Sequence, residues 1–205
     1  MPVRKVDQPP QHWDQIFAPS SCLAVITTVD QAGRVNAASF GTCTRVCHDP
    51  VYISFTVGRS KNTADNIRET GEFTVNLPKF DRADLERVRV VGLPFDKGVN
   101  ELPKAGLTEI PARVIRSPRI EEFPRHFECK VEWTHEWVNR LMVCGKVVAV
   151  SADEDCVDAD GKVIWDRVKP AHFCGRPYDG GFVAAYQAMS VDITYDGPEA
   201  LRYME

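Results

Sequence analysis

Short runs of β-branched and aromatic residues, each followed by a turn signal, occupy both ends of this chain. Residues 23–30 read LAVITTVD and end in the turn residues DQAG, and RVNAASF at 34–40 then resumes the apolar pattern, which predicts a hairpin. Residues 51–57, VYISFTV, alternate large apolar residues with small or hydroxylated ones, as a strand with one buried face does. The N-terminal part of the chain therefore predicts three strands close together in sequence.

Strand signals return in the second half after an irregular middle. Residues 126–138 and 140–153 indicate two long strands, and residues 155–166 predict a hairpin that turns at an Asp-Gly pair. Between the two halves, residues 78–125 contain scattered prolines and few periodic runs, and 81–92 is the stretch that predicts a helix there. We expect this middle segment to consist mostly of long connections.

Strands at both ends with an irregular middle favour a mostly β fold with peripheral helices. This pattern is typical of an antiparallel β-barrel and differs from the regular alternation of βαβ units. The hydrophobic fraction of 43% and the charged fraction of 26% are ordinary for a globular protein. No repeat, low-complexity segment or linker-like change in composition divides the 205 residues, so we expect one domain spanning 1–205.

Charge and hydropathy argue against several kinds of partner. The formal net charge of −4 does not suit a nucleic-acid or anionic-membrane binder that relies on its overall field, so any anion site must be local. Residues 1–15 lack the apolar run of a signal peptide, and no stretch approaches the roughly 20 apolar residues that span a bilayer. We expect a cytoplasmic protein with no nucleic-acid and no membrane partner.

The cysteines indicate a reduced protein without a metal site. The seven cysteines form no C-x-x-C pair, and several lie inside apolar strand-like runs, so we expect free and mostly buried thiols. His126 with Cys129, and His172 with Cys174, have zinc-ligand chemistry, but neither pair repeats in the spacing that structural zinc sites use. We expect no metal.

Residues 59–66, RSKNTADN, concentrate polar side chains at the start of a predicted helix. Ser60 is the expected cap, and the helix is expected to run to about Glu69. Gly71 is expected to end it before the strand-like run FTVNL, because glycine adopts the left-handed conformation of a helix C-terminus at little cost. This stretch therefore predicts a short helix between two strands.

The start of that helix has the chemistry of a phosphate site. A helix N-terminus carries unpaired backbone N–H groups and a partial positive charge, and Arg59 and Lys61 add two full charges there. Ser60 and Thr63 add hydroxyl donors. In the alternative interpretation a hydroxyl only caps the helix and the two cations are solvated, because short basic loops are common.

A run of small and polar residues precedes this stretch. Residues 33–46, GRVNAASFGTCTRV, let a ligand approach the backbone closely, and Asn36, Ser39, Thr42 and Thr44 are able to hydrogen-bond the edge of a planar heterocycle. The alternative is an ordinary strand with small side chains. Neither G-x-x-x-x-G-K-[ST] nor G-x-G-x-x-G occurs, so a Walker-type or Rossmann nucleotide site is not expected.

Taken together, the stretch LAVITTVDQAGRVNAASFGTCTRVCHDPVYISFTVGRSKNTADNIRETGEFTVNLP resembles the flavin reductase-like family of FMN-binding split barrels. That family includes flavoredoxins and the reductase components of flavin-dependent monooxygenases. The later segments GLPFDKG, SPRIEEFPRHFECKVEWT and LMVCGKVVAVSADEDCVDADGKV are also similar to it, so the resemblance covers about residues 20–200.

The resemblance implies an antiparallel Greek-key split β-barrel that binds FMN, and it implies a role for particular positions. The residues expected to line the isoalloxazine ring and ribityl chain are Asn36, Ala37, Ala38 and Ser39, with Thr42 close by. The residues expected to bind the 5′-phosphate are Arg59, Ser60, Lys61 and Thr63. Lys97, in the segment DKG, matches a family lysine that approaches the flavin.

Two regions depart from the family pattern. Where many flavoredoxin-type members have a histidine near the flavin, this chain has Arg140. The closing segment HFCGRPYDGGFVAAY is similar only in part, and it offers Tyr178 and Phe182 as ring neighbours outside the implied site. No catalytic residue is assigned, because the flavin itself carries the redox chemistry.

The resemblance implies an NAD(P)H-dependent flavin reductase-like oxidoreductase, with FMN as cofactor and NADH or NADPH as co-substrate. Electrons would pass through FMN to a flavin, a metal or a protein acceptor, and the family is typically homodimeric. The alternative is a flavoredoxin-type electron carrier that exchanges electrons with a redox protein and has no NAD(P)H activity. A third hypothesis is a flavin-free haem or metal role, for which Cys43 and Cys47 supply material.

Overall fold

The computed structural model describes residues 5–19, 21–175 and 181–189 of the chain. Its strands are β1 (Cys22–Val29), β2 (Val35–His48), β3 (Val51–Gly58), β4 (Glu72–Leu77), β5 (Glu109–Ile110), β6 (Arg119–Ile120), β7 (Arg125–Trp137), β8 (Arg140–Ala152), β9 (Ala171–Phe173) and β10 (Phe182–Ala184). Its helices are η1 (Pro10–His12), α1 (Trp13–Phe17), α2 (Asn62–Thr70), α3 (Arg82–Val91), α4 (Glu101–Lys104), η2 (Glu154–Cys156) and α5 (Trp165–Val168).

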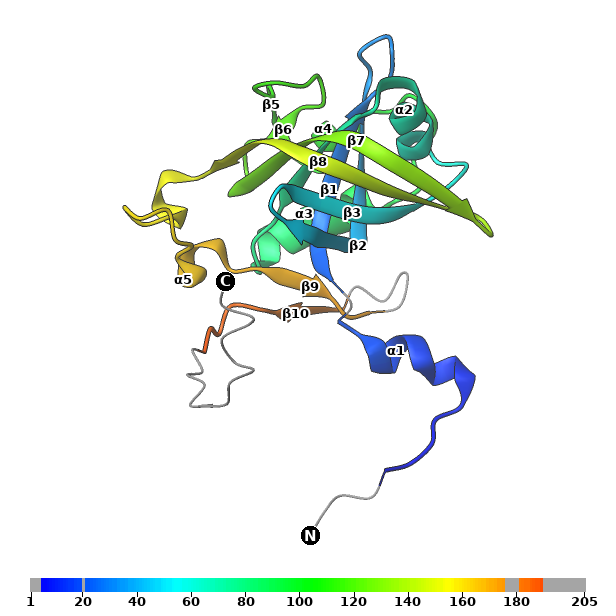
Figure 1. Cartoon of the computed structure of the whole chain (residues 1–205), viewed down its shortest axis with the longest axis vertical. Helices are drawn as coiled ribbons and strands as arrows, with labels where there is room; N and C mark the ends of the chain where they lie inside the picture. Colours follow the sequence, from blue (N-terminus) through cyan, green and yellow to red (C-terminus); the bar gives the residue numbers. More distant parts are fainter. Residues whose placement is uncertain (1–4, 20, 176–180, 190–205) are drawn as a thin grey trace, which may run out of the picture.

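Six of these strands form a closed antiparallel barrel (Figure 1). The strand order runs β1-β2-β3-β8-β7-β4, and β4 pairs back onto β1, with Val25 opposite Asn76 and Thr27 opposite Thr74. Strands β4, β1, β2 and β3 therefore lie in the order of a Greek key, in which a fourth strand returns beside the first. The mostly β, antiparallel Greek-key split-barrel prediction is confirmed.

Strand β1 is buried on both of its faces because it lies between two apolar clusters. Ala24 and Ile26 point into the barrel, where the rings of Phe40 and Phe73 meet that of Phe55 edge-on at 5.0 and 5.2 Å between centroids. A Cβ at position 145 of β8 would lie only 2.5 Å from the Phe73 ring, which is why glycine is needed there. The barrel interior is thus filled by side chains.

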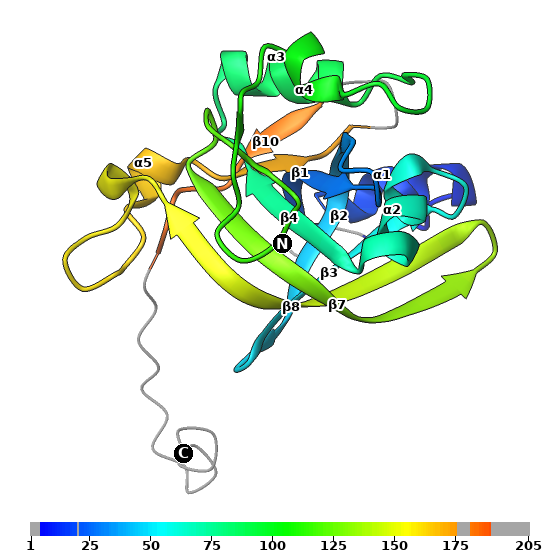
Figure 2. The ribbon, with the colours of Figure 1, turned by 90° about the horizontal axis from the view of Figure 1, so that it is seen from above.

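The second cluster lies outside the barrel, between β1 and the helices α3 and α4. Leu23 and Val25 of β1 belong to this cluster together with Val88 and Val91 of α3 and Leu102 of α4. Figure 2 shows the two helices on the opposite side of β1 from β7 and β8. This helical layer positions the segment that follows α3 against the outer face of β2.

The predicted irregular middle segment owes its order to side chains of the barrel. Residues 111–120 form few strand hydrogen bonds, since β6 is the one strand among them, so their backbone N–H and C=O groups need other partners. Glu128 accepts from the N–H groups of Arg113 and Val114 at 2.7 and 2.8 Å, and Asn76 accepts from Ile120 N–H at 3.1 Å. Thr27, Thr74 and His126 donate to backbone carbonyls of the same segment. The segment is therefore fixed against the barrel wall.

Several local expectations need correction or extension. Strand β2 runs to His48, well beyond the predicted end at residue 40. The predicted hairpin at 155–166 has a turn ending at Gly161, which has a positive φ of 77°, but its arms form a single bridge between Val157 and Val163. The arms are interrupted by the helices η2 and α5, so no ladder develops.

The cysteines and the hydropathy agree with the expectations from sequence. All seven cysteines are free, and Cys43, Cys129, Cys144 and Cys156 are buried. Burial raises the pKa of the Cys129 thiol well above its usual value, so this thiol is inert at neutral pH. Among the described residues, no helix combines the length and apolar character needed to cross a membrane.

Substitution of His126 tests how the barrel wall holds the 111–120 segment. Its ring is 4% exposed, and Nε2 donates to Ile120 C=O at 2.7 Å. Burial holds the pKa of His126 below its usual range, although the bond to Ile120 opposes this shift. Unfolded histidine binds a proton near pH 6.5, so the folded state loses stability as pH falls from about 6.5 through the lowered pKa.

We therefore expect the unfolding free energy of the wild type to drop more steeply than that of His126→Gln between pH 7.5 and 5, because Gln keeps a donor but does not titrate. Urea unfolding at a series of pH values measures this. The exposed residue His48 supplies the control His48→Gln, which should follow the wild-type curve. Identical pH curves for His126→Gln and the wild type would contradict the assignment.

Candidate functional site

The barrel opens between β2 and β3. The ladder between these strands runs from His48 opposite Val51 to Thr44 opposite Ser54 and ends there. Beyond that point the Thr42 hydroxyl replaces the ladder, because its Oγ1 accepts from Thr56 N–H at 3.2 Å. The remaining stretch of β2, residues 35–43, pairs with β1 on one edge and not with β3 on the other. We call this unpaired side the open edge of β2.

Two of the predicted site residues lie buried at the end of the barrel beneath α2. Asn36 is 7% exposed and Thr63 is 2% exposed, and Asn36 Nδ2 donates to Thr63 Oγ1 at 3.0 Å. Beside them, Asn66 Nδ2 donates to Thr28 Oγ1 at 3.0 Å. These buried polar groups satisfy one another and tie α2 to β1 and β2. In the structure without a ligand, the hydrogen bond between Asn36 and Thr63 therefore positions α2 against β2.

The first residues before α2 form a turn, residues 58–61, which we call the α2 entry turn. Lys61 N–H donates to Gly58 C=O at 3.0 Å, and the following helix has Lys61 as its N-cap residue. The prediction that Ser60 caps the helix is wrong, because Ser60 lies inside the turn and no side chain caps α2. The left-handed Gly71 at the other end is confirmed, with φ of 66°.

The α2 entry turn presents its side chains to solvent. Arg59, Ser60 and Lys61 are all exposed, and the stem of Lys61 lies over Gly58, where an added Cβ would come within 3.2 Å of Lys61 Cγ. Because Ser60 does not cap the helix, its hydroxyl stays available to a ligand. An uncapped helix N-terminus leaves backbone N–H groups directed outward, and these favour anions. The turn thus combines two cations, one hydroxyl and free amides.

The cations around this turn come from distant parts of the chain. Arg140 begins β8 directly opposite Gly58, and Arg59 N–H donates to Asn139 C=O at 3.1 Å. Lys97 reaches α2 from the segment after α3, with Nζ 3.1 Å from Asp65 Oδ2. The fold therefore brings Lys97 and Arg140 to the same end of the barrel as Arg59, and the Lys97 charge is partly balanced by Asp65.

The other predicted residues lie along β2. Ala37 is buried against the helical layer, whereas Ala38 and Ser39 are half-buried. Ser39 faces the end of α3, since a Cβ at position 92 would lie 2.7 Å from its Oγ. Ala37 N–H points away from β1 and donates to Glu101 Oε2 at 2.7 Å. Glu101 was not among the predicted residues, because nothing in its local sequence indicates a contact with β2.

The closing segment approaches β2 through a pair of aromatic rings. Phe182 of β10 lies opposite Phe173 of β9, and their rings meet edge-on at 5.8 Å between centroids. Phe173 contacts the position of Gly41, where an added Cβ would lie 3.1 Å from Phe173 Cβ. Phe182 therefore lies one ring away from β2. Tyr178 lies outside the described residues.

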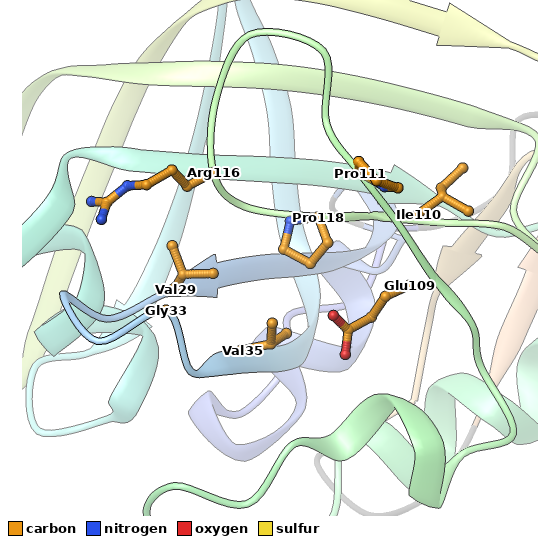
Figure 3. A pocket seen from close by; sticks show the side chains of 8 residues that line it. All are labelled: Val29, Gly33, Val35, Glu109, Ile110, Pro111, Arg116 and Pro118. Atoms are coloured by element: carbon orange, nitrogen blue, oxygen red, sulfur yellow. The ribbon is translucent and has the colours of Figure 1, made fainter.

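The described chain also has two hollows in its surface. The larger, about 380 Å³, lies between the β1–β2 hairpin and the segment 109–118 (Figure 3). Figure 3 shows the carboxylate of Glu109 directed toward Val35 and the guanidinium of Arg116 directed away from the centre. The smaller, about 220 Å³, is lined by residues that include Arg34, Asn66 and Lys97. Apart from Lys97, the predicted site residues line neither hollow. They lie along β2, in the α2 entry turn and, for Thr63, at the start of α2.

One group of metal-ligand type lies elsewhere among the described residues. Asp153, Asp155 and Cys156 place potential ligand atoms within 4.8 Å of one another. Asp153 Oδ2 lies 4.0 Å from Lys79 Nζ, and Asp155 Oδ2 lies 4.0 Å from Arg167 Nη1. Of the two pairs considered from sequence, His126 and Cys129 are otherwise engaged, since His126 Nε2 bonds to Ile120 C=O and Cys129 Sγ contacts Phe127 C=O. In the other pair, His172 Nδ1 is buried and has no hydrogen-bond partner among the described residues.

Comparison with known proteins identifies what the chain is similar to. A family model described as a flavin reductase-like domain matches residues 19–178. The relative named Uncharacterized protein YwrF, from Bacillus subtilis (strain 168), is 32% identical over 160 residues, which are 73% of this chain and 77% of that protein.

Solved structures agree on the fold. A candidate flavin reductase with a split barrel domain from Shewanella frigidimarina superposes with a TM-score of 0.78 at 17% identity, over 91% of this chain and 94% of that one. Flavoredoxin of Desulfovibrio vulgaris (Miyazaki F) superposes with a TM-score of 0.74 at 24% identity, over 85% of this chain and 91% of that one. At these identities the likeness establishes the split barrel.

The entry turn predicts a contrast between two helix starts. Asp81 caps α3, since its Oδ1 accepts from Asp84 N–H at 2.9 Å, whereas Ser60 caps nothing. We expect Asp81→Ala to cost about 0.5–2 kcal/mol of unfolding free energy. We expect Ser60→Ala to stay within about 0.5 kcal/mol of the wild type. Urea denaturation measures both, and an equal loss for the two variants would mean that Ser60 does cap α2.

Proposed function

The chain belongs to the flavin reductase-like domain family, and on that basis we propose that it binds FMN and works as an NAD(P)H-dependent oxidoreductase. The observation that carries the proposal is the α2 entry turn beside the open edge of β2. An uncapped helix start with Arg59, Lys61 and the free hydroxyl of Ser60 has the donors that a phosphate monoester needs. The adjoining strand edge has small residues against which a flat ring can lie.

In this proposal the phosphate lies at the entry turn, bound by Arg59, Ser60 and Lys61, with Thr63 holding the helix in place through Asn36. The ring and ribityl chain lie along Asn36–Ser39, with Thr42 at the point where the ladder ends. Lys97 reaches the site when it leaves Asp65. Bound FMN would supply the redox chemistry, which is hydride transfer from a reduced nicotinamide and electron transfer to a flavin, metal or protein acceptor.

We further propose that the working form is a homodimer. Large apolar side chains are exposed on the β7–β8 hairpin, where Trp133 and Trp137 are 45% and 40% exposed. Helix α1 projects away from the barrel (Figure 1), with Ile16 and Phe17 exposed by 60% and 75%. Exposed apolar groups of this size are typical of surfaces that a second chain covers. Sedimentation that finds only monomers at micromolar concentration would contradict the homodimer.

A test of the function is the absorption spectrum of the purified protein with added FMN, followed without oxygen through addition of NADH or NADPH. We expect the visible flavin bands to shift on binding and then to bleach with one of the two nicotinamides, because reduction removes the absorption of the oxidised ring. If the bound flavin stays oxidised with both nicotinamides, the protein is a flavoredoxin-type electron carrier and the proposed reductase function is wrong. A protein that binds no FMN would refute both.

The phosphate contacts have a separate test. We expect Arg59→Ala with Lys61→Ala to weaken FMN binding by about tenfold or more, since charge-assisted hydrogen bonds to phosphate are among the stronger ones. Quenching of flavin fluorescence measures the affinity. A matched control removes two exposed cations elsewhere, Lys104→Ala with Arg113→Ala, which changes the net charge equally. Equal FMN affinities for the two double variants would contradict the assignment.

A further inference from the structure

Glu101 is a buried carboxylate that contacts the open edge of β2. Its side chain is 5% exposed, and Oε2 accepts from Ala37 N–H at 2.7 Å. Glu101 is the first residue of α4, which is held in place because Asn100 Oδ1 accepts from Leu102 N–H at 3.1 Å. The carboxylate therefore reaches the strand from a fixed helix start.

Glu101 supplies the hydrogen-bond acceptor that a neighbouring strand would otherwise have supplied to Ala37 N–H. Ala37 N–H lies on the side of β2 that no longer pairs with β3, and the residue is 1% exposed. A buried backbone N–H needs an acceptor, and Glu101 provides one from 64 residues farther along the chain. The geometry of the open edge near Ala37 thus depends on Glu101.

The charge of Glu101 is not needed for this hydrogen bond, because a neutral amide oxygen also accepts from an N–H. Among the described residues, no Lys, Arg or His nitrogen forms an ion pair with Glu101. Asp84 of α3 is also buried, at 3% exposed, and also accepts a backbone N–H, but it has Arg87 Nη1 at 3.1 Å as a partner. Burial raises the pKa of the Glu101 carboxyl, and the Ala37 N–H opposes that shift. A buried carboxylate without a cation is costly, so its charge needs an explanation.

We propose that Glu101 is a positioning residue for the flavin, which fixes the open edge at Ala37 and places a negative charge beside the bound ring. This inference rests on the proposed function, since Ala37 is one of the residues assigned to the flavin. Reduction adds negative charge to a flavin, and a nearby buried carboxylate disfavours that addition. Glu101 therefore lowers the reduction potential of the bound FMN.

The test measures FMN affinity and the midpoint potential of bound FMN in three variants at this position. We expect Glu101→Gln to raise the potential while FMN affinity stays within about threefold, because the acceptor remains and the charge is gone. Glu101→Asp keeps the charge and should keep a potential near that of the wild type. Glu101→Ala removes both and should raise the potential and weaken FMN binding by about tenfold.

Asp84→Asn is the matched control, because it neutralises a buried carboxylate of the same helical layer whose partners are Lys79 N–H and Arg87 Nη1. It should lower the unfolding free energy and leave the potential unchanged. A folded Glu101→Gln protein with the wild-type potential would overturn the inference, and so would an equal shift in Asp84→Asn. Failure of the proposed function is distinguishable from these results, because it would appear as a wild type that binds no FMN. Glu101 would then have no flavin to position.

Discussion

Strand β1 hydrogen-bonds to β2 along one edge and to β4 along the other, and the barrel is closed because it does both. Its two faces are buried as well, one in the barrel interior and one under α3 and α4. A strand fixed on all sides holds β2 in place without help from β3. Strand β2 is therefore free to leave β3 beyond Thr44, and the open edge exists because β1 makes the second partner unnecessary.

Buried polar side chains do a common task around this barrel, which is to satisfy backbone groups where no ladder reaches them. Asn76 and Glu128 serve the 111–120 segment in this way. The exposed side chain of Thr42 does the same at the point where β2 and β3 separate. Glu101 belongs to the same set by geometry. It differs in its location, since its partner lies on the strand edge assigned to the flavin, and a satisfied edge there has a defined position before any ligand arrives.

Local patterns were enough to predict β1, β3 and the end of α2, because alternation and a left-handed glycine are properties of a few neighbouring residues. They failed at the start of α2, where Ser60 has the chemistry of a cap. There the bond from Arg59 N–H to Asn139 C=O joins the turn to the β7–β8 hairpin, and Lys61 becomes the cap residue. Glu101 was missed for a related reason. It lies in the irregular middle segment, and only the packing of α4 on β2 reveals its partner.

The two parts of the candidate site differ in both the sign and the burial of their charge. Arg59 and Lys61 are exposed, so their attraction for a phosphate is screened by water and salt and depends on close hydrogen bonds. Glu101 is buried, so its field is screened much less and acts on whatever lies beside Ala37. Under the proposed assignment, affinity for the phosphate and the potential of the ring would be set by different residues. A chain with a net charge of −4 is able to bind an anionic cofactor, because attraction is supplied locally at one end and the negative charge acts at the other.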